Sequence, residues 1–292
     1  MGSAKRQRGE AAFERWYTDL YGERWEGLRA ALLGGTRHAA LETGLRRPYL
    51  LDPASVLAAA ALEARPGDRV LDLCAAPGGK SLVLACGLFP GDRTCEEGPE
   101  PGELVCNERS SARRARLHRV LDDHLRPEVR RHVRVTGHDA ARWALHEAAA
   151  YDRVLADVPC SSEQHVLHSS RALAEWSPSR PKRLAQGAYA IACAAVDAVR
   201  PGGRVVYSTC ALSPYENDAV VGRLLVRGNG TLKPVDAALV TARAIEEFRE
   251  LFPGDDASEP APGESTEFGR IVLPDRDRGL GPIYFAAIER SG

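Results

Sequence analysis

The stretch "DRVLDLCAAPGGKSLVLACGLF", residues 68–89, shows how this chain begins to fold. Its first apolar residues predict a buried strand, "PGGK" at residues 77–80 predicts a turn, and the following apolar run predicts a helix. Further strands are predicted at "ELVCNE" (103–108), "HVRVTGHDA" (132–140), "YDRVLADVPC" (151–160), "GRVVYSTC" (203–210), "GRIVLP" (269–274) and "PIYFAAIER" (282–290). Strands that alternate with helices and carry continuous apolar runs predict an α/β fold, with a mostly parallel seven-stranded sheet and helices on both faces.

The N-terminal part of the chain has a different pattern. In residues 1–50, Phe13, Trp16, Tyr17, Leu20 and Tyr21 recur at helical intervals, which predicts a short helical extension ahead of a main domain at 51–292. An aromatic stripe of this kind more often packs in a core than stacks on nucleobases. The biased stretches at 90–102 and 253–267 predict surface loops.

The net charge of −1 conceals an uneven distribution. Residues 246–268 hold eight acidic residues and one arginine, whereas residues 109–134 hold nine arginines and three acidic residues. A basic helix can bind a polyanion such as a nucleic acid, although many such helices are only solvated surfaces.

The seven cysteines are scattered and form no CxxC pair, so we expect no metal site and reduced thiols. No apolar run is long enough to span a membrane, and the first residues lack the features of a transit peptide. We therefore expect a soluble protein without a membrane partner. It would be cytoplasmic in a bacterium, or mitochondrial in a eukaryote.

The predicted strands place polar side chains at one edge of the sheet, because ligands bind at the carboxyl ends of parallel strands. These side chains are Asp72, Cys74, Glu108, Asp139, Asp157, Cys160 and Cys210. Gly78 and Gly79 allow a ligand to approach the backbone at a helix N-terminus, and the dinucleotide signature GxGxxG is absent. S-adenosylmethionine has the shape for this edge, and another nucleotide ligand is an equal alternative.

Two of the thiols, Cys160 and Cys210, directly follow strands at this edge. A thiolate beside a sulfonium methyl donor suggests attack on carbon 6 of a pyrimidine, which makes carbon 5 nucleophilic. The alternative is packing, which we favour for Cys86, Cys106 and Cys193. Similarly, an aspartate at a strand end often only caps a helix.

Taken together, "DLCAAPGGK" (72–80), "DVPCS" (157–161) and "YSTC" (207–210) resemble the Sun/Fmu (nucleolar-protein) family of RNA cytosine-5 methyltransferases. The similarity extends over residues 51–288 and is strongest to the branch of mitochondrial ribosomal-RNA and transfer-RNA enzymes and their bacterial relatives. It implies a class I methyltransferase (Rossmann-like) fold. It also implies formation of 5-methylcytosine from S-adenosylmethionine.

The resemblance also implies roles for individual residues. Glu108 and Arg113 would contact the ribose, Asp139 the adenine, and Asp157 a flipped cytosine. Cys210 would be the nucleophile, and Cys160 would promote release of the methylated base. The methionine part would lie in the turn formed by Cys74, Ala75, Ala76, Pro77, Gly78, Gly79 and Lys80. Residues 162–164 stand where the family commonly has glycines.

Our leading hypothesis is therefore methylation of RNA, with ribosomal RNA favoured over transfer RNA. The alternatives are an idle RNA-binding assembly factor on the same fold, and a methyltransferase for DNA or a small molecule. The N-terminal helices, a partner protein or the arginine helix would place the RNA; the candidate phosphate contacts are Arg109, Arg113, Arg114, Arg116 and Arg119.

Overall fold

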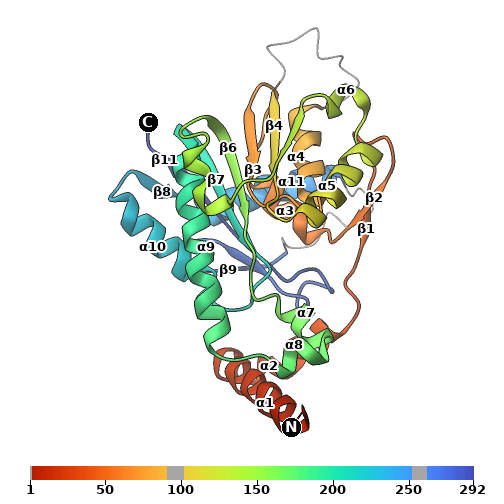
Figure 1. Ribbon diagram of the computed structural model, residues 1–292, viewed down its shortest axis with the longest axis vertical. Helices are drawn as coiled ribbons and strands as arrows, with labels where there is room; N and C mark the ends of the chain where they lie inside the picture. Colours follow the sequence, from red (N-terminus) through yellow and green to blue (C-terminus); the bar gives the residue numbers. More distant parts are fainter. Residues whose placement is uncertain (1, 91–101, 252–261) are drawn as a thin grey trace.

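A computed structural model describes residues 2–90, 102–251 and 262–292 of the chain. Within these residues, one large sheet contains nine strands in the order β5-β4-β3-β6-β7-β11-β10-β9, with β8 also paired to β11 (Figure 1). The five parallel strands are β5 (Val133–Thr136), β4 (Glu103–Asn107), β3 (Arg69–Asp72), β6 (Tyr151–Asp157) and β7 (Val199–Thr209). The antiparallel part consists of β11 (Ile283–Arg290), β10 (Arg270–Val272), β9 (Glu264–Ser265) and β8 (Leu232–Pro234).

All seven predicted strands are present, so the prediction of a mostly parallel α/β sheet is confirmed. The predicted total of seven is wrong, because β8 and β9 also join the sheet of the described residues. These strands have only three and two residues, too few to give a periodic signal. A separate hairpin of β1 (Ala39–Leu41) and β2 (Tyr49–Leu51) was also not predicted.

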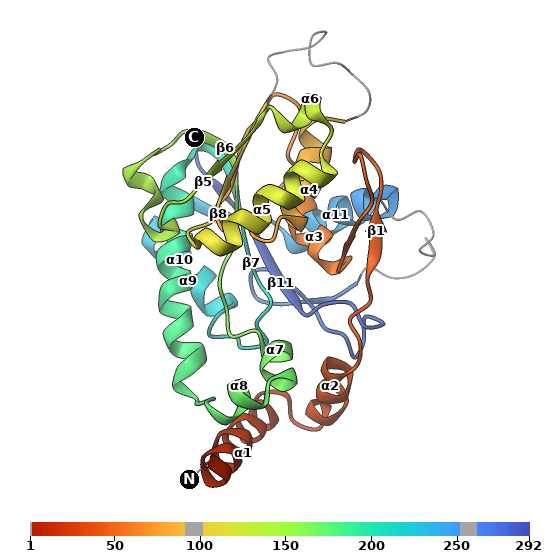
Figure 2. The same cartoon turned by 45° about the vertical axis from the view of Figure 1, so that its right-hand side comes forward.

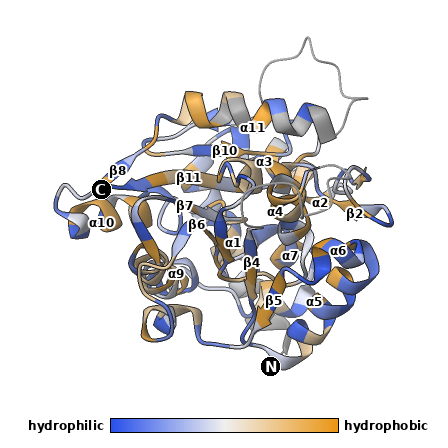
Figure 3. Cartoon of the chain, turned by 90° about the horizontal axis from the view of Figure 1, so that it is seen from above, coloured by the Kyte–Doolittle hydropathy of each residue, from blue (hydrophilic) through white to orange (hydrophobic). Residues whose placement is uncertain are grey.

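Helices cover both faces of the sheet, as predicted. One face packs against α3 (Ala54–Ala60), α4 (Gly79–Leu88), α5 (Ser111–His124) and α11 (Ala237–Leu251), and α6 (Pro127–Arg130) follows α5. The other face packs against η1 (Ala140–Leu145), α9 (Ser179–Ala198) and α10 (Asp218–Gly228). Figure 3 shows α9 and α10 on one side of the twisted sheet and α3, α4 and α11 on the other. The apolar strands lie between these layers, which explains their lack of alternation.

A smaller third core lies at the end of the molecule to which the loop after β6 leads (Figure 2). It is formed by α1 (Gly2–Tyr21), α2 (Arg24–Leu33), α7 (Glu163–His168) and α8 (Ser170–Ala174). Phe13 and Tyr17 are fully buried there, so core packing of the aromatic stripe is confirmed for them. Leu20 is 38% exposed and does not belong to this core.

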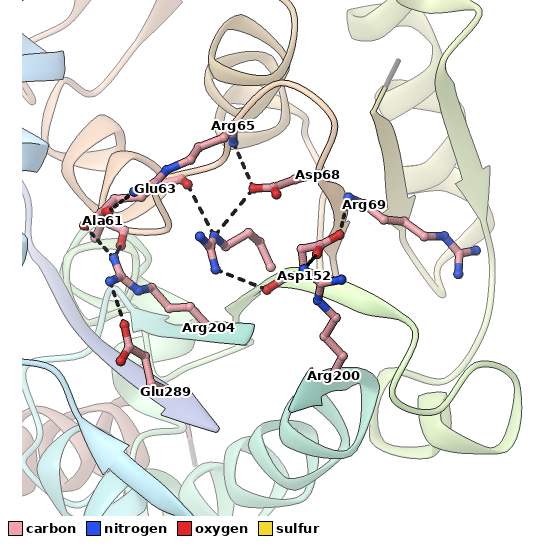
Figure 4. A network of polar contacts seen from close by, with 10 residues as sticks. Ala61, Glu63, Arg65, Asp68, Arg69, Asp152, Arg200, Arg204 and Glu289 are labelled. Carbon is pink, nitrogen blue, oxygen red and sulfur yellow. Dashed lines mark hydrogen bonds and ion pairs between the residues drawn. The ribbon is translucent and has the colours of Figure 1, made fainter. Parts of the chain in front are cut away.

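Ion pairs join the amino ends of the central strands, at the opposite edge of the sheet (Figure 4). The buried Arg204 of β7 lies 2.6 Å from Glu63 and 2.9 Å from Glu289. The Asp152 carboxylate accepts a hydrogen bond of 2.7 Å from the backbone N–H of Arg69 and so connects β6 to β3. This edge therefore serves to hold strands together.

Two surface loops were predicted, at 90–102 and 253–267. Most residues of both loops, and Cys95 among them, lie outside the described residues. Within the part of the chain that the structure describes, no helix combines the length and apolar character that a membrane span requires.

Candidate active site

A cavity of about 480 Å³ opens at the carboxyl ends of β3, β6 and β7. This volume is in the range of small-molecule sites. Seven of the predicted site residues line it: Cys74, Ala76, Lys80, Arg113, Asp157, Cys160 and Cys210. The structure thus brings the glycine-rich turn and both cysteine motifs to one place, although these motifs are far apart in the sequence.

The turn between β3 and α4 forms one wall of the cavity. Gly78 has a φ of +121°, which only glycine adopts readily, and a Cβ there would lie 3.0 Å from Val120. Ala75 donates a backbone hydrogen bond of 2.8 Å to Asn107 at the end of β4, which fixes the turn. Pro77 and Gly79 complete it, and the unpaired N–H groups of the α4 N-terminus lie in this turn.

Glu108 and Arg113 lie together beside this turn. Arg113 donates a hydrogen bond of 2.8 Å to the carbonyl of Ala76 and forms an ion pair of 3.3 Å with Glu108. Glu108 is 6% exposed and also accepts a hydrogen bond from the backbone of Ser110, the N-cap of α5. Arg113 therefore lines the cavity with Glu108 beside it, and the contact of the pair with a ribose stays a prediction.

Asp139 is not brought to the cavity. Its carboxylate accepts a hydrogen bond of 3.2 Å from the backbone of Ala141 and caps η1, and its side chain is 42% exposed. Its predicted contact with adenine stays untested, and capping is the role that its contacts explain. Asp72 also differs from expectation: it is buried beneath the cavity, where it accepts a hydrogen bond from Ser81, and burial raises its pKa to about 7.

A lysine–aspartate pair lies inside the cavity. Lys80 Nζ, from the first turn of α4, lies 2.8 Å from Asp157 Oδ2 at the end of β6. Burial lowers the pKa of Lys80, but the charge and the hydrogen bond of Asp157, together with the charges of Cys210 and Asp72, outweigh this effect and hold that pKa above its ordinary value. The site therefore contains an ammonium group that can donate a proton or a hydrogen bond to Asp157 and to a bound ligand.

The two predicted thiols face each other. Cys160 Sγ and Cys210 Sγ are free and lie 2.9 Å apart, and Ser162 Oγ lies 3.2 Å from Cys210 Sγ. The hydrogen bond from Cys160 lowers the pKa of Cys210, and the one from Ser162 adds to this effect against the opposing effect of burial. The same contact raises the pKa of Cys160. Cys210 is therefore the thiol that ionises first, as a nucleophile must.

A buried group of carboxyls connects the loops that carry the two thiols. Glu216, six residues after Cys210, accepts a hydrogen bond of 2.8 Å from the backbone of Ser161, and its other carboxyl oxygen lies 2.6 Å from the Ser161 hydroxyl. The same hydroxyl contacts Glu163, which also accepts hydrogen bonds from Tyr17 of α1 and from the backbone of Leu212. Ser161, Glu163 and Glu216 are fully buried.

Sequence reasoning missed several residues of this site. Ser162, Glu163 and Glu216 support the thiols, and Asp52 and Gln164 line the cavity. One signal in the sequence could have indicated this loop, because residues 162–164 stand where the family that the chain resembles commonly has glycines. Ser162 has a φ of +51°, a conformation that favours glycine, so the backbone turns at this position. Among the described residues, no group of three or more His, Cys, Asp or Glu side chains is placed to hold a metal ion.

Comparison with known proteins agrees with this geometry. Residues 59–261 match the family model described as "16S rRNA methyltransferase RsmB/F". The 5-cytosine rRNA methyltransferase NSUN4 of Bos taurus is 36% identical over 254 residues, which cover 85% of this chain and 60% of that protein. The mitochondrial tRNA (cytosine(34)-C(5))-methyltransferase of Mus musculus is 33% identical, with coverage of 85% and 66%. The chain thus spans about 60% of the length of the NSUN4 relatives.

Solved structures agree on the fold. The NSun6 protein of Pyrococcus horikoshii superposes with a TM-score of 0.62 at 22% sequence identity. The superposition covers 84% of this chain and 53% of that one.

Proposed function

Because this chain belongs to the RsmB/F family, we propose that it methylates carbon 5 of a cytosine in RNA with S-adenosylmethionine as donor. The observation that carries the proposal is the pair of thiols 2.9 Å apart, at a cavity that also holds Lys80 and Asp157. Neither idle RNA binding nor simple packing explains two facing thiols beside a partly buried ion pair.

The residues present fit the proposed donor. The cavity of about 480 Å³ has room for a nucleoside with an amino-acid tail. The turn before α4 lines the cavity with Cys74, Ala76 and Lys80 and suits a carboxylate at the helix N-terminus, and the Glu108 carboxylate, paired with Arg113, suits a ribose diol. When bound, S-adenosylmethionine supplies an electrophilic methyl group. The chain itself orients the base and moves the protons.

Cys210 begins the reaction on the base. Its thiolate forms a bond from sulfur to carbon 6 of the cytosine, and the electron pair of the ring double bond moves toward carbon 5 and ring nitrogen 3. A proton passed from Lys80 through Asp157 to nitrogen 3 neutralises the charge that develops there. Carbon 5 is then nucleophilic enough to accept a methyl group.

Release reverses the first step. Carbon 5 loses its hydrogen as a proton to water, the electron pair of that bond forms the double bond to carbon 6, the bond from Cys210 to carbon 6 breaks, and sulfur leaves as a thiolate. Cys160 lies within contact distance of that sulfur and promotes the elimination. Nitrogen 3 returns its proton to the pair of Lys80 and Asp157, so the protein ends as it began.

We propose ribosomal RNA as the substrate, with transfer RNA as the second candidate. The family description names 16S rRNA, and the relative at 36% identity is an rRNA enzyme, whereas the tRNA enzyme is 33% identical. The cytosine must leave its stack to reach the cavity, which favours a loop or another unpaired region. A protein partner that helps to place the RNA remains part of this proposal.

The test is transfer of a radiolabelled methyl group to rRNA from a strain that lacks the gene. Cys210→Ala should abolish transfer and keep donor binding, because the donor contacts lie on other residues. Cys160→Ala should accumulate a protein–RNA adduct that survives a denaturing gel. Normal turnover by Cys210→Ala would overturn the mechanism, and labelled product that resists RNase would overturn the substrate.

A further inference from the structure

An exposed aromatic cluster lies next to the loop that follows Cys210. Tyr215 in this loop is 43% exposed, and its ring centroid lies 5.8 Å from that of Trp16 on α1, with the ring planes inclined by 33°. Lys182 Nζ, at the start of α9, lies 5.4 Å from the Tyr215 centroid and 5.7 Å from that of Trp16. Three segments of the chain therefore meet in one patch of two rings and a cation.

This patch is close to the proposed reaction centre. Tyr215 immediately precedes Glu216, which is hydrogen-bonded to Ser161, and Ser161 immediately follows Cys160. Summed along these links, the Cα atoms of Tyr215 and Cys160 are at most about 17 Å apart. An extended single-stranded RNA covers such a distance with about three nucleotides. A strand whose cytosine occupies the cavity can thus reach the patch with a neighbouring base.

The charge around the patch suits a polyanion. Arg180, Lys182 and Arg183 begin α9, and Arg15 is exposed on α1. Within the described residues, no carboxylate pairs with Lys182 or Arg183, so these charges are available to phosphates. The rings offer stacking, which every base can use, and the cations offer backbone contacts.

We infer that Tyr215, supported by Trp16 and Lys182, is a stacking subsite for a nucleobase that flanks the target cytosine in single-stranded RNA. The inference rests on the proposed function, because the cytosine in the cavity sets the position of its neighbours. The base stacks on the exposed part of the Tyr215 ring, and Lys182 contacts the adjoining phosphate. The subsite holds the strand while the cytosine is out of its stack.

The experiment compares two synthetic RNA strands by fluorescence anisotropy. The first has one cytidine between adenosines, and in the second the adenosines are replaced by abasic riboses. Tyr215→Ala should weaken binding of the first strand about fivefold to a hundredfold, and binding of the abasic strand less than about twofold. Tyr215→Phe keeps the ring and should bind both strands as the wild type does. Lys182→Gln should lower the slope of affinity against salt by about one.

Tyr189→Ala is the matched control. Like Tyr215, Tyr189 carries a cation over its ring, because Arg223 lies 4.0 Å from the ring centroid. Tyr189 lies on α9, two turns after Lys182 and therefore away from the patch. This variant should bind both strands normally. Equal weakening of both strands by Tyr215→Ala would overturn the subsite, as would no weakening of either, the result expected if the patch binds a protein. If Tyr215→Ala weakens binding of the adenosine strand alone, but the wild-type protein methylates no RNA, the subsite is supported and the proposed function is overturned.

Discussion

Replacing Glu216 by glutamine tests whether a proton holds the two cysteine loops together. The Ser161 hydroxyl contacts both Glu216 and Glu163, yet it has only one proton to donate. Glu163 has other donors in Tyr17 and the backbone of Leu212, so Glu216 is the group that carries the extra proton and donates it to Ser161. Glutamine has nearly the same shape, can donate from its amide, and cannot ionise.

The size of the effect follows from the pKa of Glu216. Burial, and then the charge of Glu163, raise this pKa from its ordinary 4.5 to about 7. Between these two values the folded protein keeps a proton that the unfolded chain has lost, so the free energy of unfolding falls as the pH rises. Above pH 7 the loss is complete and amounts to about 3 kcal/mol. Below pH 4.5 it is absent.

The assay is guanidinium unfolding of the wild type and of Glu216→Gln at pH 5 and pH 8. When the pH changes from 5 to 8, the free energy of unfolding of the variant should rise by about 2 to 3 kcal/mol relative to that of the wild type. Asp72, whose pKa is also raised, adds pH dependence to both proteins and cancels in this comparison. Parallel pH dependence of the two proteins would refute the protonated link, whatever their absolute stabilities.

Three further predictions concern the thiols, the cavity and the opposite edge of the sheet. Ser162→Ala removes a hydrogen bond to Cys210, so the pKa of that thiol should rise and the acid limb of the pH–rate profile should move up by about one pH unit. Ser162→Gly should show the same shift but be about 1 kcal/mol more stable than the alanine variant in denaturant unfolding, because of the positive φ. Lys80→Met should reduce single-turnover methyl transfer by about a hundredfold or more, since it removes the proposed proton donor. Arg204→Met leaves Glu63 without its buried partner and should cost about 3 kcal/mol in denaturant unfolding, with methyl transfer unchanged below the unfolding temperature.

The fold was predictable where local sequence carries its own signal. The central strands are buried on both faces, and continuous apolar runs such as residues 283–288 of β11 reveal them directly. The start of β7 was less clear, because residues 201–203 indicate a turn. In the structure Tyr151 pairs with Val199 and Arg153 with Arg204, so residues 200–203 have no partner on β6 and form an irregularity in the register. Gly202 there has a φ of +79°, so the turn is retained inside β7, and only the earlier start of the strand at Val199 was not predicted.

The candidate site was predictable to the extent that topology alone determines it. Residues that directly follow parallel strands must meet at one edge, and this rule correctly placed Asp157, Cys160 and Cys210 at the cavity. It did not show which of these side chains line the cavity. Asp157 is the last residue of β6, whereas Asp139 lies three residues after the end of β5, where its carboxylate caps η1, and it does not line the cavity.

The pairs that support the thiols lay beyond sequence reasoning, because their members are far apart in the chain. Tyr17 and Glu163 are separated by 146 positions, and Ser161 and Glu216 by 55. Each of these residues has an ordinary explanation when it is considered alone, as a core tyrosine, a helix start or a loop acid. Together they make the N-terminal helix part of the support of the site. The hydroxyl of Tyr17 on α1 donates a hydrogen bond to the Glu163 carboxylate. Glu163 contacts Ser161, and Ser161 contacts Glu216, so this chain of contacts holds the loop of Cys160 against the loop of Cys210. A helix that the sequence presents as a packing extension therefore contributes to the spacing of the two thiols on which the proposed chemistry depends.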